Sequence, residues 1–222
     1  MTCADLLGSV EGSARHRPRG HVVSTIAQPA APALLADRAL PRSLATDVGL
    51  VVGGALLTAL MAQLYVPLPL VPITGQTMAV LLVGASLGAA RGAASMSLYA
   101  LLGMVGLPVY SDGAGGMDVV LGATGGYIVG FVGAAALVGW LAQRAWERTF
   151  LKALLTFLAG TGVTFLVGVP WLAAVAGLDL PAALANGLYP FVVPGIVKAA
   201  VVAGLLPLAW KGAERLAARR DR

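Results

Sequence analysis

Residues 66–127 read VPLPLVPITGQTMAVLLVGASLGAARGAASMSLYALLGMVGLPVYSDGAGGMDVVLGATGGY, and this segment decides the fold. Two apolar runs, Thr74–Leu87 and Ala93–Val105, are joined by a tight turn that carries one arginine. The Gly-rich segment after them, residues 106–126, is long for a connection, and such loops are usually functional or disordered. Because glycines permit close approaches that other residues block, we expect this loop to fold over a small molecule at a membrane surface.

The composition indicates an integral membrane protein. Of the 222 residues, 58% are hydrophobic and 11% are charged, and the mean hydropathy is +0.85. A soluble domain carries about 25% charged residues, so this chain cannot cover a surface that faces water. The single cysteine, Cys3, excludes an internal disulfide framework and a multi-cysteine metal site. Both histidines, His16 and His21, lie in the polar N-terminal region, away from the expected spans.

The hydrophobic spans predict an all-α membrane protein with six transmembrane helices. They cover Leu44–Tyr65, Thr74–Ala90, Ala93–Gly106, Gly125–Ala142, Phe150–Ala176 and Gly195–Trp210. About 20 residues cross a bilayer as a helix, so the shorter second and third spans are expected to be tilted or partly re-entrant. Residues 1–43 are interpreted as a disordered cytoplasmic tail, with a lipid- or partner-binding arm as the alternative. Residues 44–222 form the membrane domain with its basic C-terminal tail.

The basic residues predict the orientation of this domain. With six spans, all but one of the 15 lysines and arginines fall on one side of the membrane. The positive-inside rule makes that side the cytoplasm. Both termini are then cytoplasmic, and the long Gly-rich loop between the third and fourth helices is extracellular. The net charge of +5 is thereby explained as a topology signal, and no nucleic-acid partner is expected.

The remaining basic residue, Lys198, is the main candidate for ligand binding. It is expected within about the first turn of the sixth span, near the outer face. A cation inside the membrane costs about 2.5–3.5 kcal/mol on insertion scales, and the helix macrodipole disfavours a cation at an N-terminus. Either the amine snorkels to the outer headgroups, or it receives an anionic group of a ligand. Asp112, Asp118 and Asp179, the acids on the outer side, are possible internal partners.

Several other residues have two open interpretations. Thr74 and Gln76 open the second span, where they either cap the helix or line a polar cavity. Tyr99 and Tyr110 fit an interfacial aromatic belt or the walls around a ring. Asn186 could cap a helix, anchor it or contact a ligand.

Helix packing and energy supply point to a partner. Ala55 and Ala59 have a four-residue spacing that lets helices approach closely, either within the chain or against a partner subunit. No Gly-x-x-x-x-Gly-Lys-Ser/Thr motif for ATP occurs in the sequence, so uphill transport would need a partner. A membrane enzyme acting on lipid is the rival class, but it would need a nucleophile with a base or a metal cluster, which the sequence does not offer.

Four runs of the sequence resemble the BioY family, the biotin-specific S components of energy-coupling factor transporters. They are VPITGQT at 71–77, LGAARG at 87–92, GLPVY at 106–110 and GATGGY at 122–127. The resemblance covers about residues 44–210. It implies a six-helix membrane protein that binds biotin from outside without a cofactor and works with a transmembrane T component and paired ATPases, with homo-oligomers possible. An S component for another small carboxylate vitamin is the alternative.

The resemblance also implies roles for individual residues. Lys198 matches a family lysine and is expected to pair with the biotin carboxylate, whereas Gly195 stands where the family has an aspartate. The ureido ring is then expected to bond to the loop, and Ala55 and Ala59 match a family motif that contacts the T component. The expected ligand residues are Gln76, Tyr99, Tyr110, Ser111, Asp112, Gly115, Gly116, Tyr127, Asn186 and Lys198.

Overall fold

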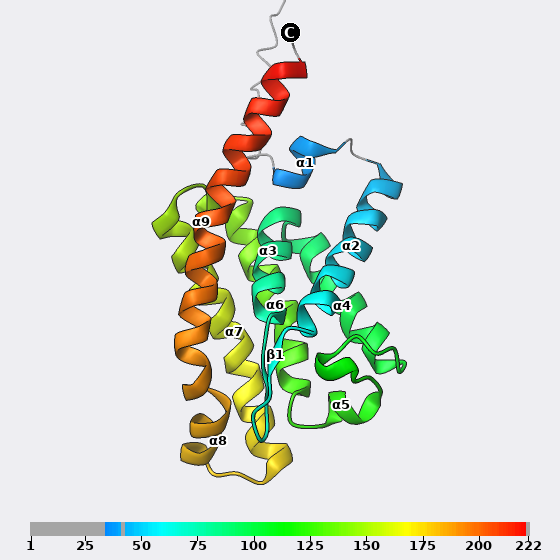
Figure 1. Cartoon of the computed structure of the whole chain (residues 1–222), viewed down its shortest axis with the longest axis vertical. Coiled ribbons are helices and arrows are strands. Elements are labelled where there is room, and N and C mark those ends of the chain that lie inside the picture. Colours follow the sequence, from blue (N-terminus) through cyan, green and yellow to red (C-terminus); the bar gives the residue numbers. More distant parts are fainter. Residues whose placement is uncertain (1–33, 41–42, 221–222) are drawn as a thin grey trace, which may run out of the picture. The chain divides into compact units, whose positions relative to one another are not determined.

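The apolar runs of the sequence form helices, and segments rich in glycine and proline separate them. The computed structural model describes residues 34–40 and 43–220. In chain order, its elements are α1 (Leu35–Ala39), α2 (Leu44–Ala62), β1 (Tyr65–Val66), β2 (Ile73–Thr74), α3 (Gln76–Leu87), α4 (Ala89–Met104), the 3₁₀ turn η1 (Ser111–Gly113), α5 (Met117–Leu121), α6 (Gly125–Ala142), the 3₁₀ turn η2 (Trp146–Arg148), α7 (Phe150–Ala176), α8 (Leu180–Gly187) and α9 (Tyr189–Arg220) (Figure 1).

Local signals explain where several of these helices begin and end. The Ser43 side chain accepts a hydrogen bond from the Thr46 N–H at 3.1 Å and so caps α2, and Asp179 caps α8 in the same way through the Ala182 N–H at 2.9 Å. Gly88 separates α3 from α4 with φ at 85°, a conformation that glycine adopts without strain. The chain therefore turns from α3 into α4 within a single residue.

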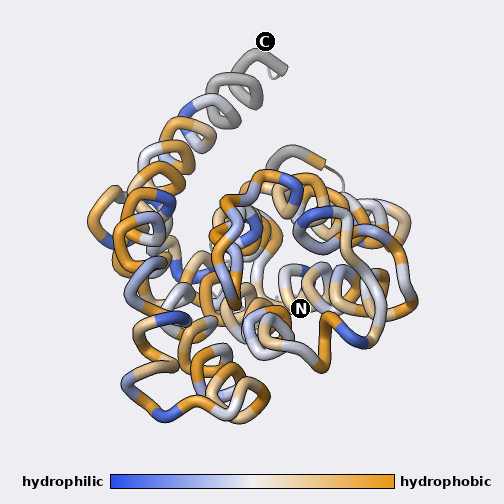
Figure 2. Tube along the Cα trace, turned by 60° about the horizontal axis from the view of Figure 1, so that its bottom comes forward, coloured by the Kyte–Doolittle hydropathy of each residue, from blue (hydrophilic) through white to orange (hydrophobic). Residues whose placement is uncertain are grey.

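Helix α6 forms the centre of the bundle, and α2 lies at its edge. Helix α6 packs against α3, α4 and α7, and 61% of its residues are buried, compared with 17% for α2. Hydrophobic residues nevertheless continue over the outward faces of the long helices (Figure 2). Exposed hydrophobic faces on long helices are what contact with lipid requires.

Four segments of the described chain are long and apolar enough to cross a membrane. They are Leu44–Ala62, Gly125–Ala142, Phe150–Ala176 and Leu180–Gly212. Helix α3 has 12 residues and rises about 18 Å, short of the roughly 30 Å of a bilayer core. The structure thus supports a helical membrane protein with four candidate spans, while six complete spans stay a prediction.

The predicted bounds of two helices agree with the structure to the residue, whereas the predicted start of a third helix is wrong. Helices α6 and α7 match the predicted fourth and fifth spans. Helix α9, however, starts at Tyr189 and runs through Pro194 and Pro207, so Lys198 lies more than two turns inside the helix. The argument that a macrodipole disfavours Lys198 was therefore wrong, because the dipole acts mainly on the first turn.

Part of the predicted disordered tail is helical. Most of residues 1–43 lie outside the described residues, but Leu35–Ala39 forms α1. Leu34, 6% exposed, packs into the core between α3, α6 and α9. Arg91 binds Asp37 at 2.6 Å and Asp47 at 3.1 Å. These contacts order residues 34–37 across the end of the bundle that the Arg91 turn occupies.

Candidate functional site

One pocket gathers polar and aromatic residues from distant parts of the chain. It lies between β2, the Gly-rich loop and helices α3, α6, α7 and α9. Its lining residues are Val71, Pro72, Thr74, Gln76 and Thr77 from β2, α3 and the segment before them, Tyr110, Ser111 and Val119 from the Gly-rich loop, Thr124, Tyr127, Ile128 and Phe131 around α6, Thr161, Thr164 and Phe165 from α7, and Phe191, Pro194, Gly195 and Lys198 from α9.

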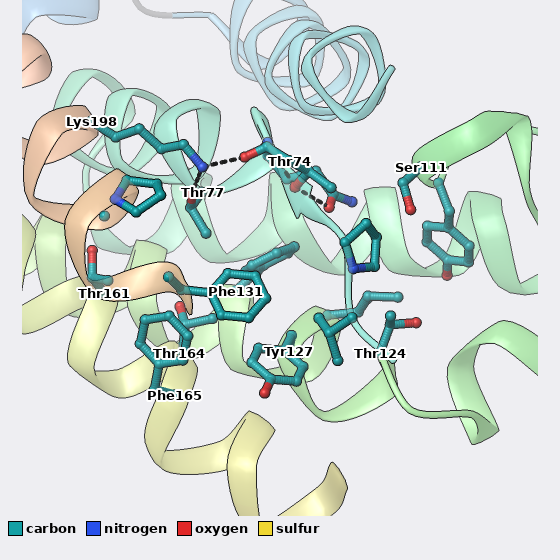
Figure 3. A pocket seen from close by; sticks show the side chains of 18 of the residues that line it. Thr74, Thr77, Ser111, Thr124, Tyr127, Phe131, Thr161, Thr164, Phe165 and Lys198 are labelled. Carbon is teal, nitrogen blue, oxygen red and sulfur yellow. Dashed lines mark hydrogen bonds between the residues drawn. The ribbon is translucent and has the colours of Figure 1, made fainter. Parts of the chain in front are cut away.

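Lys198 supplies the positive charge of this pocket. Its ammonium donates hydrogen bonds to the Thr74 carbonyl and, at 3.2 Å, to the Thr77 hydroxyl (Figure 3). In the described part of the chain no carboxylate forms an ion pair with it. Two neutral acceptors hold the amine in place but leave its charge uncompensated, and a partly buried charge without a counterion is costly. The site is therefore suited to an anionic group.

The acids expected as internal partners of Lys198 are engaged elsewhere or stand apart from it. Asp112 accepts a hydrogen bond of 2.7 Å from the Tyr65 hydroxyl, which raises the pKa of Tyr65. Asp179 caps α8, and Asp118 lies in the first turn of α5. None of them is paired with Lys198 among the ion pairs of the described residues.

Aromatic side chains form the middle of the pocket. The Tyr127 hydroxyl donates to the Gly187 carbonyl at 2.8 Å, and its ring meets Phe165 edge-on with centroids 6.0 Å apart. Phe165 also contacts Phe191, with centroids 5.8 Å apart. In the view of Figure 3, Lys198 lies at the left and Ser111 at the right, and the rings of Phe131, Tyr127 and Phe165 lie below the line that joins them. The pocket thus has an apolar wall below two separated polar groups.

Tyr110 and Ser111 bring the Gly-rich loop to the pocket. The Tyr110 hydroxyl donates to the Ala100 carbonyl at 2.7 Å, and its ring rests on Gly103, where a methyl group would overlap the ring. Burial raises the pKa of Tyr110 to about 12, so its hydroxyl stays a neutral donor near pH 7. Ser111 follows at the start of η1 and presents a hydroxyl at the pocket wall.

Gln76 is held by a polar chain that leads away from the pocket. It accepts a hydrogen bond from the Thr74 hydroxyl at 2.7 Å and donates to the Tyr99 hydroxyl. Tyr99 is 0% exposed and meets Tyr110 edge-on with centroids 5.5 Å apart. Tyr99 therefore supports Gln76 and Tyr110 from behind and does not line the pocket.

Half of the ten predicted ligand residues line the pocket, and the other half do not. Lys198, Gln76, Tyr110, Ser111 and Tyr127 belong to the lining, whereas Tyr99, Asp112, Gly115, Gly116 and Asn186 do not. The Asn186 amide donates to the Ala182 carbonyl at 2.9 Å within α8. The Gly116 N–H donates to the Gly103 carbonyl at 2.7 Å, so Gly116 shapes the loop without facing the cavity.

Helix α7 contributes pocket residues that were not predicted from the sequence. Thr161, Thr164 and Phe165 line the pocket at helical spacing, and the Thr164 hydroxyl bonds back to the Gly160 carbonyl at 3.4 Å. The threonines of this otherwise apolar helix could have indicated a polar cavity beside it. Gly195 faces the same region, because a Cβ there would lie 3.7 Å from the Thr161 side chain. An absent side chain at Gly195 therefore leaves room beside Thr161.

The structure also bears on the two alanines of α2. Ala55 is 0% exposed and belongs to the core beside α4, and Ala59 packs against the same cluster. The open positions of α2 are Gly49 and Gly53, where an added Cβ would meet no atom within 4 Å. The methyl group of Ala55 is covered within the chain, which fits the internal-packing interpretation, and docking of Ala55 and Ala59 on a partner stays a prediction.

Comparison with known proteins places the chain in a family. The model of the BioY family matches residues 31–215. The chain is 34% identical to biotin transporter BioY2 of Lactococcus lactis subsp. cremoris, over 67% of this chain and 81% of that protein. It is 38% identical to a probable biotin transporter of Pyrococcus horikoshii, over 70% of this chain and 91% of that protein.

A solved structure has the same fold. It is the crystal structure of the S-component for biotin from an ECF-type ABC transporter, with a TM-score of 0.69 and 24% identity over 75% of this chain and 92% of that one. The long family match and the similarity to two transporters along most of their lengths agree with this shared fold. The chain belongs to the BioY family.

Proposed function

We propose that the protein binds biotin and serves as the substrate-binding subunit of an energy-coupling factor transporter in the cytoplasmic membrane. The observation that carries this proposal is the uncompensated cation of Lys198 in a pocket with aromatic walls. Biotin has a carboxylate, an apolar chain and bicyclic body, and a ureido group that both donates and accepts hydrogen bonds. The names of the relatives, all biotin transporters, support this ligand.

In the proposed pose, the carboxylate pairs with Lys198 and the apolar body lies against Tyr127, Phe131 and Phe165. The ureido group is placed toward Ser111, whose hydroxyl can donate and accept. Gln76, fixed between Thr74 and Tyr99, offers a further polar contact between the two ends. The carboxylate supplies the charge that Lys198 lacks, and so binding removes an electrostatic cost of the empty site.

The proposed topology has six membrane-crossing segments and cytoplasmic termini, with α3 and α4 as the shorter pair. Arg144 and Arg148 lie on the connection between α6 and α7, and Arg91 and Lys152 lie in the first turns of α4 and α7, at ends assigned to the cytoplasm. The Gly-rich loop is then extracellular, and the pocket opens toward the side from which a vitamin would arrive. Cysteine labelling from outside in whole cells tests this topology, since Ser111→Cys should react and Thr149→Cys should not.

Transport is proposed to depend on a T component and paired ATPases. If α2 is the helix that meets the T component, its available surface is the face with Gly49, Gly53, Leu56 and Leu60, because Ala55 is covered. Uptake of labelled biotin by cells that contain the chain alone, compared with cells that also contain the partners, would measure this dependence.

The direct test of the ligand is competition. Purified protein should bind labelled biotin, and excess unlabelled biotin should displace it while other carboxylate vitamins should not. Displacement by another vitamin at equal concentration would favour an S component of different specificity. Failure to bind any vitamin in the panel would overturn the proposal.

A further inference from the structure

The C-terminal end of α2 supports the η1 turn, which carries Ser111, from outside the pocket. Gln63 is the residue that ends this helix, and its side chain reaches the η1 turn in two places. The amide nitrogen donates to the Tyr110 carbonyl at 3.0 Å, and the amide oxygen accepts from the Gly113 N–H at 3.1 Å. One carboxamide thus brackets the turn immediately before and after Ser111 and Asp112.

The bracketed turn has an unusual backbone. Asp112 adopts φ 60° and ψ 31°, a left-handed conformation that is rare for residues other than glycine but that aspartate adopts more readily than most. The Tyr65 hydroxyl, two residues after Gln63, donates to the Asp112 carboxylate at 2.7 Å. The left-handed residue points Asp112 outward to α2 and β1, while the preceding Ser111 lines the pocket.

The same stretch of chain, residues 63–65, also holds the Lys198 side of the pocket. The Leu64 carbonyl accepts a hydrogen bond from the Gly75 N–H at 2.7 Å, and Tyr65 pairs with Thr74 in the two-stranded sheet. The Thr74 carbonyl is the acceptor that receives the Lys198 ammonium. Residues 63–65 therefore connect to both polar sides of the site without lining it themselves.

We propose that Gln63 is a positioning residue for the ligand, which holds the Ser111 hydroxyl in its binding orientation. Tyr110, the other lining residue of this turn, has its own anchor through the Ala100 carbonyl, so loss of Gln63 acts mainly on Ser111. This inference rests on the proposed function, because it takes biotin as the ligand. It attributes part of the affinity for biotin to Gln63, a residue that does not line the pocket.

A double-variant cycle on the purified full chain tests this role. Gln63→Met keeps the length of the side chain and removes both hydrogen bonds to the η1 turn, together with the one to the Ala59 carbonyl. Ser111→Ala removes the hydroxyl that the turn presents. Each is expected to raise the Kd for biotin about 2- to 10-fold, the value of a typical neutral hydrogen bond. The double variant should raise it no further than about twofold beyond the larger single effect, because the two changes remove the same contact.

Two further variants guard against a loss of folding. Gln143 ends α6 as Gln63 ends α2, and Gln143→Ala should leave the Kd unchanged. Gln63→Glu keeps the acceptor for the Gly113 N–H and loses the amide donor to the Tyr110 and Ala59 carbonyls, so it should fall between wild type and Gln63→Met. If Gln63→Met does not fold, the same cycle with Gln63→Glu decides the question.

The outcomes separate this inference from the proposed function. Normal biotin binding by the unaltered chain, together with effects of Gln63→Met and Ser111→Ala that multiply in the double variant, would overturn the positioning role alone. An unchanged Kd in folded Gln63→Met would do the same. Absence of biotin binding by the unaltered chain would overturn both proposals.

Discussion

The two polar sides of the pocket are built in different ways. Lys198 is carried by α9 and is held by the Thr74 carbonyl and the Thr77 hydroxyl, so its position is fixed by helices and a short sheet. Ser111 is carried by a 3₁₀ turn in a loop, and that turn is held from outside by Gln63 and Tyr65. The charged contact thus has a rigid frame, while the neutral contact depends on a few surface hydrogen bonds.

This difference suggests a division of labour. The charged side supplies most of the binding energy, since an ion pair in a desolvated site is worth more than a neutral hydrogen bond. The loop side has weaker polar contacts and only the short helix α5, so it can open for entry at a lower cost than the helical side, as local stability follows the number of buried contacts. Substitutions on the two sides should therefore differ in size.

Replacement of Lys198 should have the largest effect. Lys198→Met removes the charge and keeps much of the apolar stem, and it should weaken biotin binding by about 2–5 kcal/mol, the usual loss for a buried charge pair. Titration calorimetry in detergent measures this change. Lys152→Met is the matched control, because Lys152 is exposed at the start of α7 and its loss should leave the Kd unchanged.

The aromatic middle should come next. Phe165→Ala removes a ring that contacts Tyr127 and Phe191 and lines the pocket, so affinity should fall by about 1.5–3 kcal/mol. The neighbouring Leu166 is 75% exposed on the outside of the bundle, and Leu166→Ala should bind biotin as wild type does. Equal losses from both changes would show that the effect comes from helix α7 as a whole.

Ser111 should matter less than either of these residues. Ser111→Ala removes one hydroxyl, and the loss should be about 0.5–1.5 kcal/mol. Ser43→Ala serves as its control, because it removes a helix cap on α2; it should lower the melting temperature without changing the Kd. A loss at Ser111 as large as that at Lys198 would contradict the proposed division between the two sides.

Tyr65 should give the smallest change. Tyr65→Phe removes the hydrogen bond to Asp112, which lies at the surface, and the effect on the Kd should stay below about threefold. The dissociation rate in stopped-flow measurements should rise more than the association rate falls, because the bond holds the loop closed after entry. A slower association with unchanged dissociation would instead place Tyr65 on the entry path.

The same comparison explains what the sequence could predict. Lys198 stood out because a lone cation in an apolar helix has few explanations, and Tyr127 and Gln76 followed from motifs at the starts of α6 and α3. Long apolar runs also marked α6 and α7 to the residue. Such features depend on composition and helical spacing, which are local properties of the chain.

Features that depend on the path of a loop were not predictable in this way. The neighbours Ser111 and Asp112 were both predicted to bind the ligand. In the structure Ser111 lines the pocket and Asp112 faces Tyr65, because the left-handed backbone at Asp112 turns its side chain away from the pocket. The spacing of Ala55 and Ala59 left packing within the chain and docking on a partner both open, because spacing alone does not tell which face of α2 is covered. Gln63 drew no attention because its role consists of contacts with residues about 50 positions away.

Recognition of the ligand's carboxylate by Lys198 can be tested directly with two ligands and two proteins. The Kd for biotin and for biotin amide, which lacks the charge, should be determined for wild type and for Lys198→Met. Wild type should prefer biotin at least roughly tenfold, a difference of about 1.4 kcal/mol, and Lys198→Met should bind both ligands with nearly equal affinity. If the variant keeps the full preference for biotin, the carboxylate is recognised elsewhere and the account of this site is wrong.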